Sequence, residues 1–262
     1  MCCEKKAYGS LLYEVENRIA TITMNEPKKL NALDARLASE ITAALGEAKD
    51  DESVKVVVLT GAGKAFCAGG DISVFTKLDL EGSIKFVKDA HSLVGAFTKM
   101  PKPVIAAVNG FAVGAGLSLT LLSDIVISSD KAMYGAAFVN VGLVPDIGSL
   151  YFLPRLVGLQ KAKELAFTGK NIDANEAYRL GIVNTVVGHE TFGQAVQDFS
   201  KLLAGQSGSA MGYAKQLLNS SFDLGIDELL EIEAITQGVC MQSADSKEGV
   251  DAFINKRKAV FK

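Results

Sequence analysis

The chain has 262 residues and a formal net charge of −3, and 48% of its residues are hydrophobic and 22% charged. These values are typical of a globular protein and exclude a disordered chain, and the lack of a basic excess argues against a nucleic-acid partner. Its four cysteines and two histidines show no spacing typical of metal ligands, so we expect no zinc or haem site.

Strand and helix patterns alternate through the first half of the chain. In chain order they predict a β-hairpin of strands 11–16 and 19–24, a helix over 33–49, a buried strand over 54–59, a helix over 83–100, a buried strand over 104–108, a buried helix over 114–123 and a core strand over 125–127. Near-continuous Val and Ile runs are typical of a mostly parallel sheet covered on both faces. The sequence therefore predicts an α/β fold.

From about residue 159 onward the periodicity is helical. The predicted helices span 161–167, 174–180, 191–203, 211–221, 226–241 and 247–258, and small and polar residues at 204–209 interrupt them. We therefore expect a core domain over residues 1–204 and a C-terminal helical region over residues 205–262. The apolar stripes of that region would dock on the core or on another subunit.

Residues 103–123 carry no charge and are long enough to span a bilayer. They also contain Asn109, several glycines and several hydroxyl residues, which favour a buried strand, a turn and a buried helix. The N-terminus lacks the apolar stretch of a signal peptide. We therefore expect a cytoplasmic protein without membrane association.

Two turns of small residues, each after a buried strand, are the unusual features of the sequence. Ala68-Gly69-Gly70-Asp71 follows the strand over 54–59, and the turn over 109–116 leads from the next strand into a helix. Small residues let a ligand approach the backbone, and the first turn of a helix leaves N–H groups unpaired. Two such turns that converge can hold an oxyanion, although the glycines would also suit tight turns and close helix–strand packing.

Several motifs, in order and spacing, resemble the crotonase (enoyl-CoA hydratase/isomerase) superfamily over nearly the whole chain. The matching stretches are KKLNAL at 28–33, FCAGGD at 66–71, the IAAVNG and GAG motifs within 105–124, GLVPD at 142–146, and 168–184. The resemblance implies a spiral of ββα turns, assembly into a homotrimer or a hexamer (a dimer of trimers), and an acyl-CoA thioester as substrate. It implies no metal or redox cofactor, because CoA is part of the substrate.

The resemblance also implies roles for individual residues. The backbone N–H groups of Gly70 and Ala115 would bind the thioester carbonyl and stabilise an enolate oxygen. The other positions that would contact the substrate are Lys28, Ala68, Asp71, Ile72, Phe138 and Ser118. A solvated surface lysine is the alternative interpretation of Lys28, and Asp71 is also expected to order its own turn through backbone hydrogen bonds.

Hydratases of this family use two glutamates, and this chain has neither. The two positions are occupied by Ser118 and Phe138. Serine cannot serve as a carboxylate, and phenylalanine cannot transfer a proton. The sequence therefore argues against ordinary two-glutamate hydration.

Asp146 is the carboxylate that remains in this neighbourhood, and the pattern is most similar to single-aspartate isomerases related to the phenylacetate-pathway isomerase. A shift of a double bond from Δ3 to Δ2 needs one base, which takes a proton from C2 and returns it at C4. The apolar neighbours Phe138, Val141 and Leu143 would desolvate Asp146 and raise its pKa. An aspartate after proline and before a helix is also a common N-cap, so a capping role competes.

The expected function is thus an enoyl-CoA isomerase with Asp146 as proton shuttle. One alternative is hydration by Asp146 alone with an ordered water, and another is a catalytically silent acyl-CoA-binding subunit. Dehalogenation, decarboxylation and thioester hydrolysis are weaker alternatives. Dehalogenases of this family combine an aspartate with a histidine and a Trp-containing acyl pocket, and this chain has no Trp.

Overall fold

A seven-stranded sheet forms the base of the fold in the computed structural model, which describes residues 4–261. Cys2, Cys3 and the first residues on which the signal-peptide expectation rests lie outside the described part. The strands of this sheet, in spatial order, are β1 (Glu4–Ala7), β2 (Leu11–Glu16), β3 (Ile19–Met24), β4 (Val56–Gly61), β6 (Val104–Val108), β8 (Ile125–Ser129) and β11 (Thr185–Val187). β1, β2 and β3 are antiparallel neighbours, and the pairs from β3 to β11 are parallel. The predicted hairpin and the mostly parallel sheet are therefore confirmed.

A second sheet of short strands, which the sequence patterns did not predict, lies beside the first. Its strands, in spatial order, are β10 (Asn171–Asp173), β9 (Met133–Gly135), β7 (Phe111–Val113) and β5 (Ala65–Cys67). The sequence patterns did not show these strands, because each has only three residues and such short segments show no period of two. The chain passes from each long strand to a short one, as in β4–β5, β6–β7 and β8–β9, so successive turns form a spiral.

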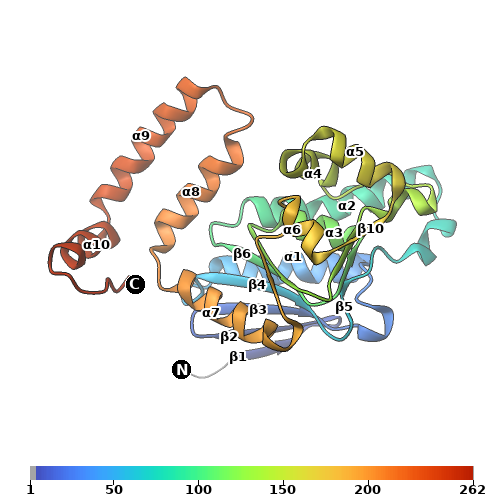
Figure 1. Cartoon of the computed structure of the whole chain (residues 1–262), viewed down its shortest axis with the longest axis horizontal. Helices are drawn as coiled ribbons and strands as arrows, with labels where there is room; N and C mark the ends of the chain where they lie inside the picture. The colour runs from blue at the N-terminus through green and yellow to red at the C-terminus, as the bar shows by residue number, and fades with distance from the viewer. Residues whose placement is uncertain (1–3, 262) are drawn as a thin grey trace.

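Helices cover both faces of the larger sheet (Figure 1). They are α1 (Ala35–Asp50), α2 (Leu80–Thr98), α3 (Ala115–Leu122), α4 (Ser149–Val157), α5 (Leu159–Thr168), α6 (Ala174–Arg179) and α7 (Phe192–Ala204), with 3-10 turns η1 (Pro27–Lys29), η2 (Ile72–Lys77), η3 (Ala137–Val141) and η4 (His189–Thr191). The main core contains Leu37 and Ile41 of α1 and Phe97 of α2. On the opposite face, Phe192 and Phe199 of α7 pack against a second apolar cluster.

In the segment over residues 103–123 the predicted buried strand and buried helix are confirmed as β6 and α3, and the predicted turn between them also contains the short strand β7. No helix within residues 4–261 is long and apolar enough to cross a membrane. A helix after Asp146 was expected without bounds, and it is α4; the helical pattern assigned from residue 159 onward overlooked β10 and β11, which are strands of only three residues.

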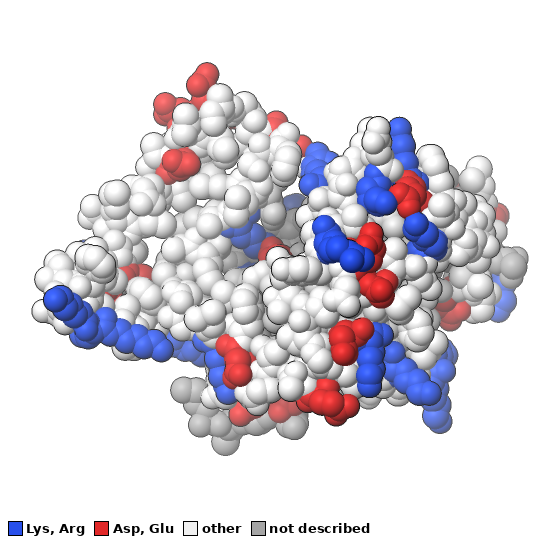
Figure 2. Space-filling model, viewed as in Figure 1, with Lys and Arg blue, Asp and Glu red and all other residues white. Residues whose placement is uncertain are grey.

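Three helices, α8 (Gly208–Ser220), α9 (Ile226–Gln242) and α10 (Ala244–Ile254), extend to one side of the core (Figure 1). Helix α8 is attached to the core by an ion pair from Lys215 to Asp124, whereas α9 has no buried residue. Much of this face of the C-terminal helices is uncharged (Figure 2). The exposed large apolar side chains include Ile226, Leu230, Ile235, Val239, Met241, Phe253 and Ile254. No segment within residues 4–261 covers this apolar surface.

Candidate active site

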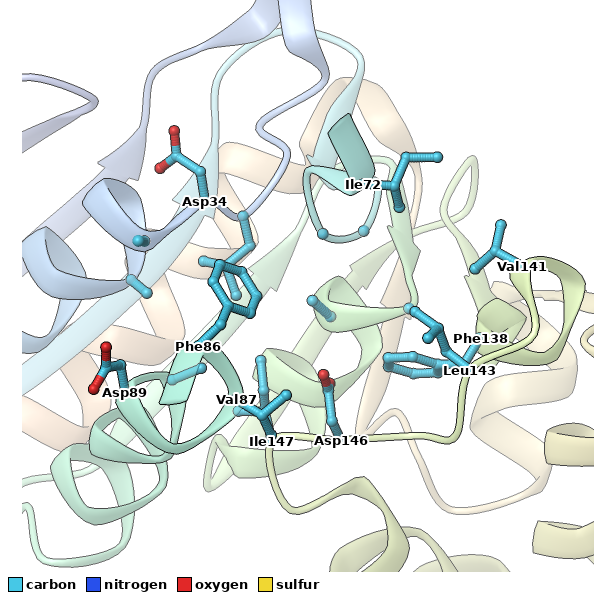
Figure 3. Close-up of a pocket in the computed structure, with 18 of the residues that line it drawn as sticks. Asp34, Ile72, Phe86, Val87, Asp89, Phe138, Val141, Leu143, Asp146 and Ile147 are labelled. Atoms are coloured by element: carbon cyan, nitrogen blue, oxygen red, sulfur yellow. The ribbon is translucent and has the colours of Figure 1, made fainter. Parts of the chain in front are cut away.

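A cavity of about 790 Å³ lies between α1, α2, the start of α3 and the loop after η3. Its wall is largely apolar, and Phe138 and Leu143 lie beside the carboxyl group of Asp146, which points into the space, while Phe86 lies across the cavity (Figure 3). Such a cavity is large enough for a small organic ligand. Of the residues predicted for the site, the cavity brings together six: Ala68, Gly70, Ile72, Ala115, Phe138 and Asp146.

The two small-residue turns meet at the wall of this cavity. Gly69 and Gly114 adopt positive φ angles of 125° and 55°, a backbone region that favours glycine. A Cβ atom on Gly114 would lie 3.5 Å from the Cα atom of Gly69, so the turns are in contact. Helix α3 also packs tightly on β5, because a Cβ atom on Gly116 would lie 1.9 Å from the carbonyl oxygen of Cys67. The glycines therefore serve close packing and bring two backbone segments to one place.

The backbone N–H groups of Gly70 and Ala115 are free to bind a ligand. Both residues line the cavity, and neither N–H donates a hydrogen bond to any group in residues 4–261. Ala115 is the first residue of α3, where N–H groups lack a partner within the helix and the helix dipole is positive. Together the two donors can stabilise a negatively charged oxygen.

Asn31 holds the KKLNAL segment against this turn. Its side chain is fully buried, its Nδ2 donates to the carbonyl oxygens of Ala62 (3.0 Å) and Ala65 (2.8 Å), and its Oδ1 accepts from the N–H of Glu26 (2.9 Å). The asparagine thus ties η1 to β5, which precedes the Gly70 turn. Lys28 is exposed on η1 and does not line the cavity.

Asp146 lies in the loop between η3 and α4. Its Oδ1 atom is buried and has no hydrogen-bond partner within the described residues. Burial raises the pKa of the carboxyl above its ordinary value, and the charge of His91 acts in the opposite direction. A buried carboxyl with a raised pKa and no partner is a stronger base than a solvated one.

The N-cap role considered for Asp146 was wrong. The N-cap of α4 is Gly148, and no side chain caps this helix. Instead, the carbonyl oxygen of Asp146 accepts from the N–H of Ser149 at 3.0 Å, across a turn whose central residues Ile147 and Gly148 have φ angles of 47° and 79°. The positive φ angles are typical of a type I′ turn, and this turn directs the Asp146 side chain into the cavity.

Two other carboxylates that line the cavity are already engaged. Asp34 is the N-cap of α1, and its Oδ1 accepts from the N–H of Leu37 at 2.8 Å. Asp89 on α2 pairs with Lys85 at 2.6 Å and is well exposed. Asp146, whose Oδ1 atom is buried without a partner among the described residues, therefore differs from both.

The two positions where hydratases carry glutamates, 138 and 118, lie in different surroundings. Phe138 is 8% exposed and forms part of the cavity wall beside Asp146 (Figure 3). Ser118 is completely buried and does not line the cavity. Its hydroxyl contacts Ser149 and the backbone of Asp146 instead, so this residue lies behind Asp146 and not beside the cavity.

Asp71 does not line the cavity either. Its Oδ1 accepts from the N–H of Ser73 at 3.0 Å, and hydrogen bonds from Ser73 hold the pKa of Asp71 below its ordinary value. The predicted turn-ordering role of Asp71 is thus confirmed. The Cys67 thiol is buried, which raises its pKa to about 11 and makes a nucleophilic role unsuitable, as expected.

Helix α2 supplies part of the site; the sequence pointed to the region of residues 73–96 for the acyl pocket but did not identify the individual residues that line it. Phe86, Val87 and Ala90 line the cavity opposite Asp146. Their helical spacing was a signal that they share a face, but the sequence does not tell which element that face meets.

The sequence and the fold are similar to those of known proteins. The enoyl-CoA hydratase/isomerase family matches residues 14–262 of the chain. A short-chain-enoyl-CoA hydratase of Clostridium acetobutylicum is 37% identical over 251 residues, covering 95% of this chain and 96% of that protein. A 1,2-epoxyphenylacetyl-CoA isomerase of Escherichia coli is 36% identical over 257 residues, covering 96% and 97%. The structure of an enoyl-CoA hydratase/isomerase from Cupriavidus metallidurans has a TM-score of 0.93 at 33% identity and covers 98% of this chain and 97% of its own.

Proposed function

The chain belongs to the enoyl-CoA hydratase/isomerase family, and we propose that within it the protein shifts a double bond of an enoyl-CoA thioester from Δ3 to Δ2. The resemblance seen in the sequence is confirmed at the level of the family and of its spiral fold. The observation that carries the finer proposal is the buried Oδ1 of Asp146, which has no partner among the described residues and belongs to a carboxyl that faces the cavity that Gly70 and Ala115 also line.

The proposed reaction begins with the thioester carbonyl accepting hydrogen bonds from the N–H groups of Gly70 and Ala115. Asp146 takes a proton from C2, and the electron pair of the C2–H bond delocalises into a dienolate. Each N–H donor of this kind stabilises the developing oxyanion by about 3 kcal/mol in comparable sites. Asp146 then returns the proton to C4, which leaves the double bond between C2 and C3 and regenerates the carboxylate.

The apolar wall supports this role for Asp146. Phe138, Val141 and Leu143 line the cavity on its side, and burial raises the pKa of the carboxyl. A raised pKa makes Asp146 a stronger base, and the apolar surroundings keep water from the dienolate. With Phe138 at one glutamate position and the buried Ser118 at the other, the cavity has no second carboxylate at the positions that hydratases use.

Hydration by Asp146 with an ordered water is the second candidate. It is favoured by the names of the relatives, since hydratases outnumber the isomerase among them. Hydration of a 2-enoyl-CoA would remove the conjugated double bond, whereas isomerisation of a 3-enoyl-CoA creates it. Ultraviolet absorbance therefore separates the two reactions.

The decisive experiment incubates the protein with 3-enoyl-CoA and with 2-enoyl-CoA of matched chain length. A rise in absorbance with the first, lost by about 100-fold to 10,000-fold in Asp146→Asn, supports the isomerase. Asp89→Asn is the matched control, because this carboxylate lines the same cavity but is paired with Lys85. Loss of absorbance with the second substrate and no rise with the first would establish the hydratase instead. Binding of both without turnover, and without deuterium exchange at C2, would indicate the silent binding subunit.

The remaining roles and the assembly are part of the same proposal. We assign substrate contacts to Ala68, Ile72 and Phe138, and a CoA contact to Lys28, while the buried Ser118 and the turn residue Asp71 act without touching the ligand.

Residues 205–262 would form the assembly region of a homotrimer or hexamer, because α9 and α10 expose large apolar side chains. We propose the cytoplasm as the location of this assembly. Light scattering coupled to size exclusion tests the assembly, and a monomeric mass would contradict it.

A further inference from the structure

Ser118 connects the two parts of the candidate site from behind. It lies one turn into α3 and is fully buried, as is its neighbour Ser149 at the start of α4. The two hydroxyl oxygens are 2.7 Å apart. Ser118 Oγ also lies 3.2 Å from the carbonyl oxygen of Asp146 and 3.4 Å from that of Gly114.

Each of these two carbonyl groups belongs to the catalytic apparatus proposed above. The carbonyl of Gly114 and the N–H of Ala115 are parts of one planar peptide unit, so a contact to one restricts the direction of the other. The carbonyl of Asp146 anchors the turn that directs the carboxyl into the cavity. Ser118 therefore holds the backbone of both the proposed oxyanion donor and the proposed base: its N–H donates to the carbonyl of Gly114 at 3.1 Å, and its hydroxyl contacts the carbonyl of Asp146.

The hydroxyl protons of Ser118 and Ser149 can both be given an acceptor. Ser118 donates its hydroxyl proton to the nearer carbonyl, that of Asp146. Ser149 donates its hydroxyl proton to Ser118 Oγ, and the described hydrogen bonds give the Ser149 hydroxyl no other acceptor. The Asp146 carbonyl then accepts from Ser118 as well as from the N–H of Ser149. Buried hydroxyls satisfied in this way rigidify the backbone that they contact.

The turn over residues 146–149, which these bonds hold, has a strained backbone. Ile147 has a φ angle of 47°, and a β-branched residue in this left-handed region is strained. Such strain persists only where the surroundings fix it. The side chain of Ile147 is buried, and the Ser118–Asp146 bond fixes the preceding carbonyl.

We propose that Ser118 and Ser149 are a positioning pair that sets the carboxyl of Asp146 relative to the N–H of Ala115. This inference rests on the proposed function, in which these two groups act on one thioester. Position 118, where two-glutamate hydratases carry an acid, thus has a structural link to the base in this chain. The pair acts on turnover and not on affinity, because neither hydroxyl reaches the cavity.

The test compares Ser118→Ala and Ser149→Ala with Ser123→Ala. Ser123 is the matched control, because its hydroxyl donates to Leu119 on the same helix and contacts no residue of the site. A displacement of reacting groups by about 1 Å can cost 100-fold, so we expect kcat for the active substrate to fall about 10-fold to 100-fold in both variants. We expect KM to change less than threefold, and the acid limb of the pH profile to move toward lower pH as the freed carboxyl meets water. Unchanged kcat in both variants, with active wild-type protein, would overturn the proposal.

Hydrogen exchange of the peptide that covers residues 143–150 provides a readout independent of turnover. Without the pair, the N–H of Ser149 should exchange faster, and it should be unchanged in Ser123→Ala. If Ser118→Ala fails to fold, Ser149→Ala decides, because it keeps the Ser118–Asp146 bond and removes only the hydroxyl that orients it. A wild-type chain with no turnover and no C2 exchange would overturn the proposed function and the catalytic purpose of the pair. If the wild type is active and exchange of residues 143–150 is unchanged in both serine variants, the positioning role of the pair is overturned and the proposed function is not.

Discussion

Gly114 lies against Gly69 so closely that a Cβ atom on Gly114 would be 3.5 Å from the Cα of its neighbour. This contact joins the turn after β5 to the start of α3 and brings the N–H groups of Gly70 and Ala115 to one cavity. Gly114 has φ 55° and ψ −121°, a combination that L side chains avoid.

Gly114→Ala should therefore damage catalysis more than stability. Alanine would force the peptide before Ala115 to rotate, at a cost of about 1–3 kcal/mol, and the displaced donor should reduce kcat/KM by about 100-fold. The measurement is steady-state turnover together with chemical denaturation. Gly95→Ala is the control, because no atom within 4 Å would meet its Cβ and alanine favours the α2 helix by up to about 1 kcal/mol. Full activity in Gly114→Ala would show that the Ala115 donor is not needed.

The raised pKa of Asp146 predicts the direction of the pH dependence. The base is active when ionised, so turnover should be lost as pH falls through the raised pKa, at a higher pH than for a solvated carboxyl. A pH–rate profile of kcat/KM checks this. An acid limb at or below the ordinary pKa of aspartate would contradict a desolvated base.

The same shift makes Asp146 a stability cost near neutral pH. A carboxyl whose pKa is raised on folding stabilises the fold only while it is protonated, and this contribution is lost as pH rises through the folded-state pKa. Asp146→Asn should therefore have a higher Tm than the wild type at pH 7, and the difference should shrink in acid. Thermal unfolding at several pH values tests this, and a lower Tm at neutral pH would contradict it.

His91 on α2 provides a charge that acts on Asp146. Its charge lowers the pKa of the Asp146 carboxyl, so His91→Gln should move the acid limb of the pH–rate profile to higher pH. His189→Gln is the natural control, since the chain has only two histidines and His189 contacts Ser129 instead. A profile that moves equally in both variants, or in neither, would exclude this interaction.

The ion pair between Lys215 and Asp124 should anchor the C-terminal helices. The Nζ–Oδ2 distance is 2.7 Å, the two side chains are 8% and 23% exposed, and Asp124 also accepts from the N–H of Val104. Loss of one partner leaves a buried charge, so Lys215→Met should reduce the unfolding free energy by about 3–5 kcal/mol. Lys85→Met is the control, because the Lys85–Asp89 pair is 74% and 61% exposed and should contribute less than about 1 kcal/mol. Equal effects in urea unfolding would contradict the anchoring role.

The long elements could be predicted from the sequence because their side-chain periodicity is local. The apolar spacing of α1 and the Val and Ile runs of β4 and β6 identify these elements within a few residues. The three-residue strands of the second sheet could not be identified, because they are defined by hydrogen bonds to distant partners. The glycine turns were visible as motifs, but their contact was not.

The sequence by itself determined the residue types available for chemistry: glycines at 69, 70 and 114, a serine and a phenylalanine at 118 and 138, and one aspartate at 146. Only the tertiary structure decided what these residues do. It buried Ser118 behind Asp146, assigned the N-cap of α4 to Gly148 and placed α2 across the cavity. Burial and unpaired hydrogen-bonding groups depend on segments far apart in the chain, so the pKa of Asp146 and the freedom of two N–H groups arise only when the spiral closes around the cavity.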